Sequence, residues 1–297
     1  PSFEYSGLML SEACFKVRRE VAYCDQVGAA LAYFDSVSSA YPNDKDMAFL
    51  SSRAHYMNAI CLNNGIIFSD DSLTMLACNE YYKALEIMEQ HFDEEQIVGH
   101  KASFMALIFA RLANIYSDKF LIEPTIYFYN NVLNYKRKAH NPPSSLANTL
   151  FFLGYEYEKS EQYDSALYYY GESLRYNSSL PNRLDVEKSI AKILFHKGEK
   201  DSAYVLLKNN LREIDNENLK YSYHCTLGDV YYSDKKYDSA LYYLETSLDN
   251  DIVTKKVAFT TKLSAIYDSL GDYDKRDYYD NFSVKMFLNH ANKEVDN

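Results

Sequence analysis

The chain repeats itself at a fixed interval, and this restricts its fold more than any other feature. The segment Gln162–Tyr170, read as Gln-Tyr-Asp-Ser-Ala-Leu-Tyr-Tyr-Tyr, recurs as Lys236–Leu244, and a related segment begins at Lys200. Each copy carries one alanine at the same place, and these alanines are 37 residues apart: Ala166, Ala203 and Ala240. A period of this length is typical of arrays in which each unit packs mainly on its neighbours.

Each repeat is predicted to contain two helices. The second helix follows an aspartate that we expect to be its N-cap, at Asp164, Asp201, Asp238 and Asp274. Upstream, a large residue followed by a small one recurs at Leu153-Gly154, Ile190-Ala191, Leu227-Gly228 and Leu263-Ser264. Small residues let two helices approach closely, so Gly154 and Gly228 are expected at helix contacts rather than in turns. Steps of three and four residues place the large side chains on one helix face.

This unit, with two antiparallel helices and alternating small and large residues, resembles the tetratricopeptide repeat. The resemblance implies an all-α fold, a right-handed superhelical solenoid of antiparallel helix pairs, spanning 1–297 as a single array. Its units are expected near residues 11–44, 47–91, 95–139, 147–180, 184–217, 221–254 and 257–290.

Two units depart from the pattern. The second has a lengthened turn, an insertion over residues 63–71. In the last unit the small position is Arg276 and the aromatic position is Asp280, which would be costly to bury. We therefore interpret 257–290 as a capping unit or as a junction to a further segment.

Composition limits the fold and the partners. Nine glycines and six prolines among 297 residues disfavour all-β folds and Gly-rich phosphate loops. The net charge of −11 argues against nucleic-acid binding by this segment, and the basic run Lys136–Lys138 is interpreted as a helix C-terminus. The longest apolar stretch, Phe104–Ala110, is too short to cross a bilayer, so we expect no membrane insertion by this segment.

No motif for catalysis or metal binding is found. The sequence lacks the phosphate-loop, dinucleotide-binding, zinc-protease and nucleophile-elbow patterns, and its seven histidines lack metal-ligand spacing. Neighbouring His224 and Cys225 point about 100° apart on a helix, so they cannot pair as base and nucleophile. We expect no catalytic residue, no cofactor and no metal ion; an enzyme is the remote alternative.

The resemblance implies a concave groove lined by the first helices of successive units. The residues expected to face it lie beside the packing positions: Asn148, Phe151, Tyr155, Lys188, Lys192, His196, Cys225, Asp229 and Tyr232. A protein or peptide partner with an acidic segment would pair with Lys188 and Lys192 and contact Phe151 or Tyr155. The alternative is that these are ordinary helix-surface residues. The Lys, Asn and Arg set with which some family members hold a C-terminal carboxylate is not found, which disfavours chaperone C-termini as partners.

Tyrosine is unusually frequent, at 30 residues, and it clusters at Tyr168–Tyr170 and Tyr242-Tyr243. We expect one ring of each cluster to occupy a packing position while its neighbours turn toward solvent or the next unit. Packing between helices is favoured over a platform for ligands.

The repeats, with their Tyr-Asp-Ser-Ala-Leu-Tyr-Tyr segments, also resemble the sensor segments of Bacteroidetes regulators. In those proteins the array precedes a membrane helix and a cytoplasmic output part. This resemblance implies an extracytoplasmic location and a sensor role within a larger signalling protein. The alternative is a free-standing scaffold or adaptor in the cytoplasm. The identity of the partner and the oligomeric state are left open by the sequence.

Overall fold

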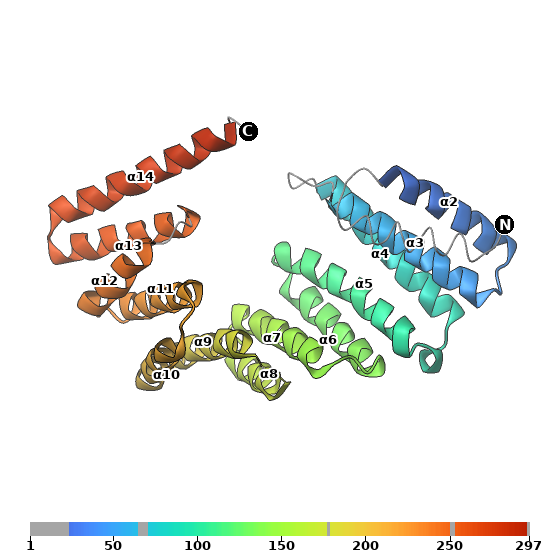
Figure 1. Cartoon of the computed structure of the whole chain (residues 1–297), viewed down its shortest axis with the longest axis horizontal. Helices are drawn as coiled ribbons and strands as arrows, with labels where there is room; N and C mark the ends of the chain where they lie inside the picture. The colour runs from blue at the N-terminus through green and yellow to red at the C-terminus, as the bar shows by residue number, and fades with distance from the viewer. Residues whose placement is uncertain (1–23, 65–70, 177–178, 250–252, 296–297) are drawn as a thin grey trace. The chain divides into compact units, whose positions relative to one another are not determined.

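The structure is a computed structural model that describes residues 24–64, 71–176, 179–249 and 253–295. Within these ranges the chain forms 13 α-helices and two short 3-10 helices and contains no strand (Figure 1). The predicted all-α class is thereby confirmed. The chain divides into two compact units, unit 1 over residues 1–176 and unit 2 over 177–297, and each is described by itself.

Unit 1 is built from helices that follow one another through short connections. They are α2 (Cys24–Ala40), α3 (Lys45–Asn64), α4 (Asp71–His91), the 3-10 helix η2 (Glu94–Gln96), α5 (Gly99–Asp118), α6 (Ile122–Lys138), α7 (Pro143–Lys159) and α8 (Tyr163–Tyr176). The most extensive contacts join α3 to α4, α5 to α6 and α7 to α8, and α2 packs on α3. Helix pairs are therefore the building blocks of this unit.

Unit 2 has the same construction. Its helices are α9 (Leu180–His196), α10 (Lys200–Glu213), α11 (Glu217–Ser233), α12 (Tyr237–Thr246), the 3-10 helix η3 (Ser247–Asp249), α13 (Val253–Leu270) and α14 (Tyr273–Val295). The pairs are α9 with α10, α11 with α12 and α13 with α14, and α9 also contacts α11. The first helices of two successive pairs thus lie side by side.

Two helix pairs depend on a glycine at their contact, as predicted. Gly154 of α7 faces the buried ring of Tyr170 in α8, and Gly228 of α11 faces the buried side chain of Leu244 in α12. A Cβ atom on either glycine would lie within 2.7 Å of the opposing side chain. The small residue therefore sets how closely the two helices approach.

The tyrosine clusters pack as predicted except at Tyr169, which packs within its own helix pair rather than toward solvent or the next unit. Tyr170 is fully buried, Tyr169 stacks on Tyr157 of α7 with ring centroids 5.2 Å apart, and Tyr168 is 63% exposed. The same stacking joins the first and second helices of two pairs in unit 2: Tyr231 with Tyr243 and Tyr267 with Tyr279. Most of the tyrosine excess at these positions is explained by packing within helix pairs.

Five turns between the two helices of a pair, from α5–α6 to α13–α14, contain a left-handed residue. Gly198 and Gly271 have φ of 89° and 75°, and Phe120, Glu161 and Lys235 occupy the same region with φ of 58°. In each turn a backbone N–H one residue later bonds back across the turn, as from Lys236 N to Tyr231 O. This is the Schellman geometry for ending a helix, which usually selects glycine.

The predicted aspartate N-caps are wrong. Asp164 and Asp274 are the second residues of α8 and α14, and the same offset is found at α10 and α12. These helices begin one residue before Asp201 and Asp238, and their N-cap residues are Glu199 and Lys236, which form no side-chain cap. The reason is that the carbonyl of the N-cap residue already accepts a helical bond, from Ala203 N and Ala240 N respectively. The aspartates instead lie in the first turn, where a carboxylate interacts favourably with the helix dipole.

Other predictions on organisation lie partly outside the described residues. This holds for residues 11–23 of the first predicted unit and for most of the insertion over 63–71. In the last pair, Arg276 forms ion pairs with Asp268 and Asp277, and Asp280 is exposed, so neither charge is buried. The single array over 1–297 and its unit boundaries stay predictions.

Candidate functional site

The predicted groove residues of unit 1 lie on α7. Asn148 and Tyr155 are exposed, and the Tyr155 ring lies 5.1 Å from Nζ of Lys159. Phe151 is half-buried and packs against the ring of Tyr170, so it belongs mainly to the α7–α8 contact. The neighbouring Phe152 is more exposed than Phe151, and sequence reasoning missed it.

Phe152 is held in place by a stacked neighbour. It is 44% exposed, and its ring lies parallel to that of Tyr129 in α6 at a centroid distance of 5.5 Å. The Tyr129 hydroxyl in turn donates to Oδ1 of Asn114 in α5. The Phe152 ring is therefore exposed on one side and fixed on the other.

In unit 2, the predicted lysines of α9 differ in how they are paired. The ammonium of Lys188 donates to Oδ1 of Asp185 at 2.9 Å and to Oγ of Ser222 in α11 at 2.8 Å. Its side chain is only 16% exposed, so its charge is balanced inside the unit. Lys192 lies one turn further along α9, is half-buried, and has no ion pair within the described residues.

The remaining predicted residues of unit 2 extend the same surface. His196 is exposed at the last residue of α9, and Cys225 and Tyr232 are half-buried on α11. Asp229 of α11 forms an ion pair with Lys262 of α13. Sequence reasoning missed Lys262 and the bond from Lys188 to Ser222, because each of these contacts joins residues more than thirty positions apart.

These contacts connect the faces of three helices. The Lys188–Ser222 bond links α9 to α11, and the Asp229–Lys262 pair links α11 to α13. We call the face that these helices form the inner face of unit 2. It is polar and of mixed charge, and it is defined by Lys188, Lys192, Ser222, Asp229 and Lys262. Such a face can hydrogen-bond an extended chain, with Lys192 as its cation without an ion-pair partner among the described residues.

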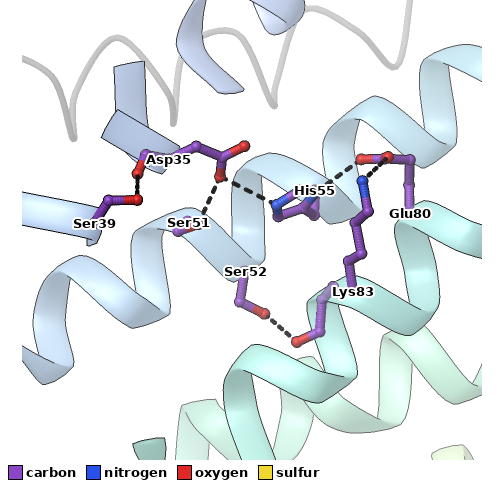
Figure 2. Close-up of polar contacts among 8 residues, drawn as sticks. Asp35, Ser39, Ser51, Ser52, His55, Glu80 and Lys83 are labelled. Atoms are coloured by element: carbon purple, nitrogen blue, oxygen red, sulfur yellow. Dashed lines mark hydrogen bonds and ion pairs between the residues drawn. The ribbon is translucent and has the colours of Figure 1, made fainter. Parts of the chain in front are cut away.

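A buried histidine network in unit 1 was not predicted at all (Figure 2). His55 of α3 is 5% exposed, and each of its ring nitrogens faces a carboxylate. Nδ1 lies 2.7 Å from Oε2 of Glu80 in α4, and Nε2 lies 3.2 Å from Oδ1 of Asp35 in α2. The network therefore joins three helices through one imidazole ring.

Both carboxylates have further partners. Oδ1 of Asp35 also accepts a bond from the Ser51 hydroxyl, and Oε1 of Glu80 accepts one from Lys83 (Figure 2). Burial alone would raise the pKa of Glu80, but hydrogen bonds from His55, Asn58 and Lys83 hold this pKa below its ordinary value. Glu80 is thus kept ionised at the centre of the network.

No motif in the sequence marks this network. His55 has no sequence neighbour with which it forms a familiar pattern, and its carboxylate partners lie 20 and 25 positions away on separate helices. In the described ranges, no group of three or more His, Cys, Asp or Glu side chains is arranged to hold a metal ion. No helix of the described segments is long and apolar enough to span a membrane.

Comparison with known proteins gives similar folds but no similar sequence. No family model matches the chain, and no curated protein matches it. Among solved structures, the apo form of RapI aligns with a TM-score of 0.60 and 12% identity over 95% of this chain and 74% of its own. The C-terminal part of a TPR repeat-containing protein from Cytophaga hutchinsonii aligns with a TM-score of 0.54 and 12% identity over 91% and 92%.

A third structure is a Rap protein complexed with competence and sporulation factor. It aligns with a TM-score of 0.51 and 13% identity, over 97% of this chain and 99% of that protein. At such low identity these likenesses concern the fold alone. Together with the helix pairs and the glycine contacts, they show that the chain has a fold of tetratricopeptide-like helix pairs.

Proposed function

Since the chain has the fold of a tetratricopeptide-repeat protein, we propose that it is a non-catalytic module that binds a protein or peptide segment. The observation that carries this proposal is the continuity of the inner face of unit 2. Lys188 reaches Ser222 and Asp229 reaches Lys262, so α9, α11 and α13 present adjoining polar surfaces. An extended chain could lie across all three helices and bond to each in turn.

The chemistry of the partner follows from the charges on this face. Lys188 and Lys262 are already paired with Asp185 and Asp229, so they offer little net charge to an acidic tail. Lys192 has no ion pair within the described part of the chain. We therefore propose a partner with one acidic residue opposite Lys192, flanked by polar or aromatic residues that contact His196 and Tyr232. This narrows the acidic segment expected from the sequence to a single acidic anchor.

A regulatory role is part of the proposal. The similar Rap protein is complexed with competence and sporulation factor, which supports a module that binds a partner. We propose in addition that the bound segment controls an attached or associated output. The same binding face would also serve a scaffold. A sensor and a scaffold would differ in what is joined to this chain. Both roles share one step, which is the binding of a partner segment.

Peptide selection tests the proposal directly. Random short peptides displayed on phage are selected on the full chain, and an enriched peptide is synthesised and titrated by calorimetry. Lys192→Glu is expected to weaken its affinity roughly tenfold or more, equivalent to about 1.4 kcal/mol, because reversal of the charge replaces attraction by repulsion. The thermal unfolding of the variant should be nearly unchanged.

Lys285→Glu provides the matched control. Lys285 is an exposed residue of α14, so this variant carries the same change in net charge away from the inner face of unit 2. Its affinity should equal that of the unchanged protein. The proposal fails if no peptide is enriched above an unrelated helical protein, or if both variants weaken binding equally.

A further inference from the structure

Both apolar and polar contacts hold α2 on unit 1. Its buried residue Phe34 packs with Met47 and Ala54 of α3 in a small cluster of its own. A second buried residue of α2, Val27, belongs to the main core of the unit. Beside this cluster, the carboxylate of Asp35 bonds to Ser51 and faces His55, both in α3. The polar contacts of Asp35 therefore add to the apolar contacts that fix this helix.

The bonding capacity of an imidazole ring depends on its charge. An imidazolium has two N–H donors, whereas a neutral imidazole has one N–H and one lone pair. In His55 both ring nitrogens face carboxylate oxygens, which accept but do not donate when ionised. Only the imidazolium form can therefore donate to Glu80 and Asp35 at the same time; in the neutral form one carboxylate faces a lone pair.

We propose that the Asp35–His55–Glu80 network is a pH-sensitive clasp that holds α2 against α3 when His55 is protonated and loosens it when the proton is lost. The proton leaves to solvent, and no other group has to change. This inference is independent of the proposed binding function, since it concerns α2, α3 and α4 of unit 1.

The geometry indicates which contact is lost. Nδ1 of His55 lies 2.7 Å from Glu80, whose side chain is 13% exposed and is also bonded to Lys83. Nε2 lies 3.2 Å from Asp35, whose side chain is 48% exposed. In the neutral ring, the single N–H therefore donates to Glu80. The contact with Asp35 is the one that is lost, because water can solvate the Asp35 carboxylate.

Among the residues that the structure describes, the charged groups around His55 come from two helices. Asp35 faces it from α2, and Glu80 and Lys83 lie on α4. On its own helix α3, the network is joined by the neutral side chains of Ser51 and Asn58. Two carboxylates and one ammonium leave the surroundings of the ring negative, which suits an imidazolium.

Hydrogen exchange measured across a range of pH tests the clasp. The full chain is exchanged between about pH 5.5 and 8.5, which brackets the ordinary pKa of histidine, about 6.5, and rates are corrected for intrinsic exchange. The opening constant of the α2 amides should rise about tenfold or more with pH, in step with the titration of the His55 ring followed by NMR. Amides of α5 and α6 should not follow it.

Variants separate the clasp from general pH effects. His55→Gln keeps one donor and one acceptor but cannot titrate, so the opening of α2 should no longer depend on pH. Asp35→Ala should leave α2 open at every pH, and it serves if the first variant folds poorly. His91→Gln removes a half-buried histidine whose ring contacts Ile87 O and no carboxylate of the described residues, and it should retain the pH dependence.

Three results would overturn the proposal. One is that His55 does not titrate within this range. Another is that it titrates while α2 opens equally at all pH values. The third is that His55→Gln and Asp35→Ala both leave the pH dependence of α2 as it is in the unchanged protein.

Discussion

Gly154 of α7 leaves the space that the ring of Tyr170 in α8 occupies. A Cβ atom at Gly154 would lie 2.6 Å from Cδ1 of that ring, which is fully buried, so the ring or a helix would have to shift. The same relationship joins Gly228 to Leu244 in unit 2. The packing of these two helix pairs is thus fixed by a glycine, which has no side chain at the contact.

Alanine at Gly154 should therefore destabilise the protein, although alanine is normally the better helix former. Gly154→Ala is expected to cost about 1–3 kcal/mol in the free energy of unfolding, because the added methyl group overpacks the contact. The control is Gly171→Ala in α8, where nothing lies within 4 Å of the added Cβ. It should gain about 0.5–1 kcal/mol from helix propensity. Urea unfolding measures both, and equal signs would refute the contact.

Glycine at a strained turn should stabilise the chain. Lys235 has φ of 58° in the turn between α11 and α12, where an L side chain is disfavoured by roughly 1 kcal/mol. Lys235→Gly should recover about this amount, measured as a rise in melting temperature. The reverse change, Gly198→Lys in the equivalent turn of the preceding pair, should lower it. Two shifts in the same direction would mean that backbone conformation does not decide these positions.

Adjacent tyrosines should differ sharply in their contribution to stability. Tyr169→Ala removes a ring that stacks on Tyr157, and it is expected to cost about 2 kcal/mol or more. Tyr168→Ala removes a ring that is 63% exposed and should cost less than about 1 kcal/mol. Denaturant midpoints compare the two variants. A larger loss at Tyr168 would contradict the packing described for this cluster.

The loss of folding stability at acidic pH should depend on Glu80. Its pKa is lowered in the folded state, so the folded protein binds fewer protons here than the unfolded chain. The resulting stabilisation is present above the unfolded pKa of about 4.3 and is lost as the pH falls through the folded value. Glu80→Gln should make the free energy of unfolding fall less steeply below about pH 5.

The control for this pH dependence is Glu89→Gln. Glu89 is an exposed residue of the same helix, α4, and no described hydrogen bond or ion pair holds it. Its variant should lose stability at acidic pH as steeply as the unchanged protein. If Glu80→Gln does so as well, Glu80 is not the group that senses acid.

Repetition explains how much of this fold could be predicted from the sequence. Gly154 and Gly228 recur at one position, and three units in succession share their alanine, so the helix pairs and their contacts could be inferred. The N-caps of α10 and α12 could not, because a Schellman turn moves each helix start by one residue. The pattern marks a turn without fixing its hydrogen bonds.

The candidate sites depend on contacts that do not repeat. Lys188 could be placed on the right helix but not paired with Ser222, because that contact depends on the approach of α9 and α11. His55 has no equivalent in the repeating pattern, and its partners come from the helices on either side. Residues that vary from unit to unit carry the specific chemistry, and a sequence period contains no information about them.

Photocrosslinking tests most directly the claim that the inner face of unit 2 binds the partner. A benzophenone amino acid replaces Tyr232 of α11 in one protein and Tyr242 of α12, which is 63% exposed, in another. The peptide obtained by selection is then irradiated with each protein, and the products are mapped by mass spectrometry. The account predicts efficient crosslinking from position 232 and little from position 242. Crosslinking from position 242 alone would contradict it.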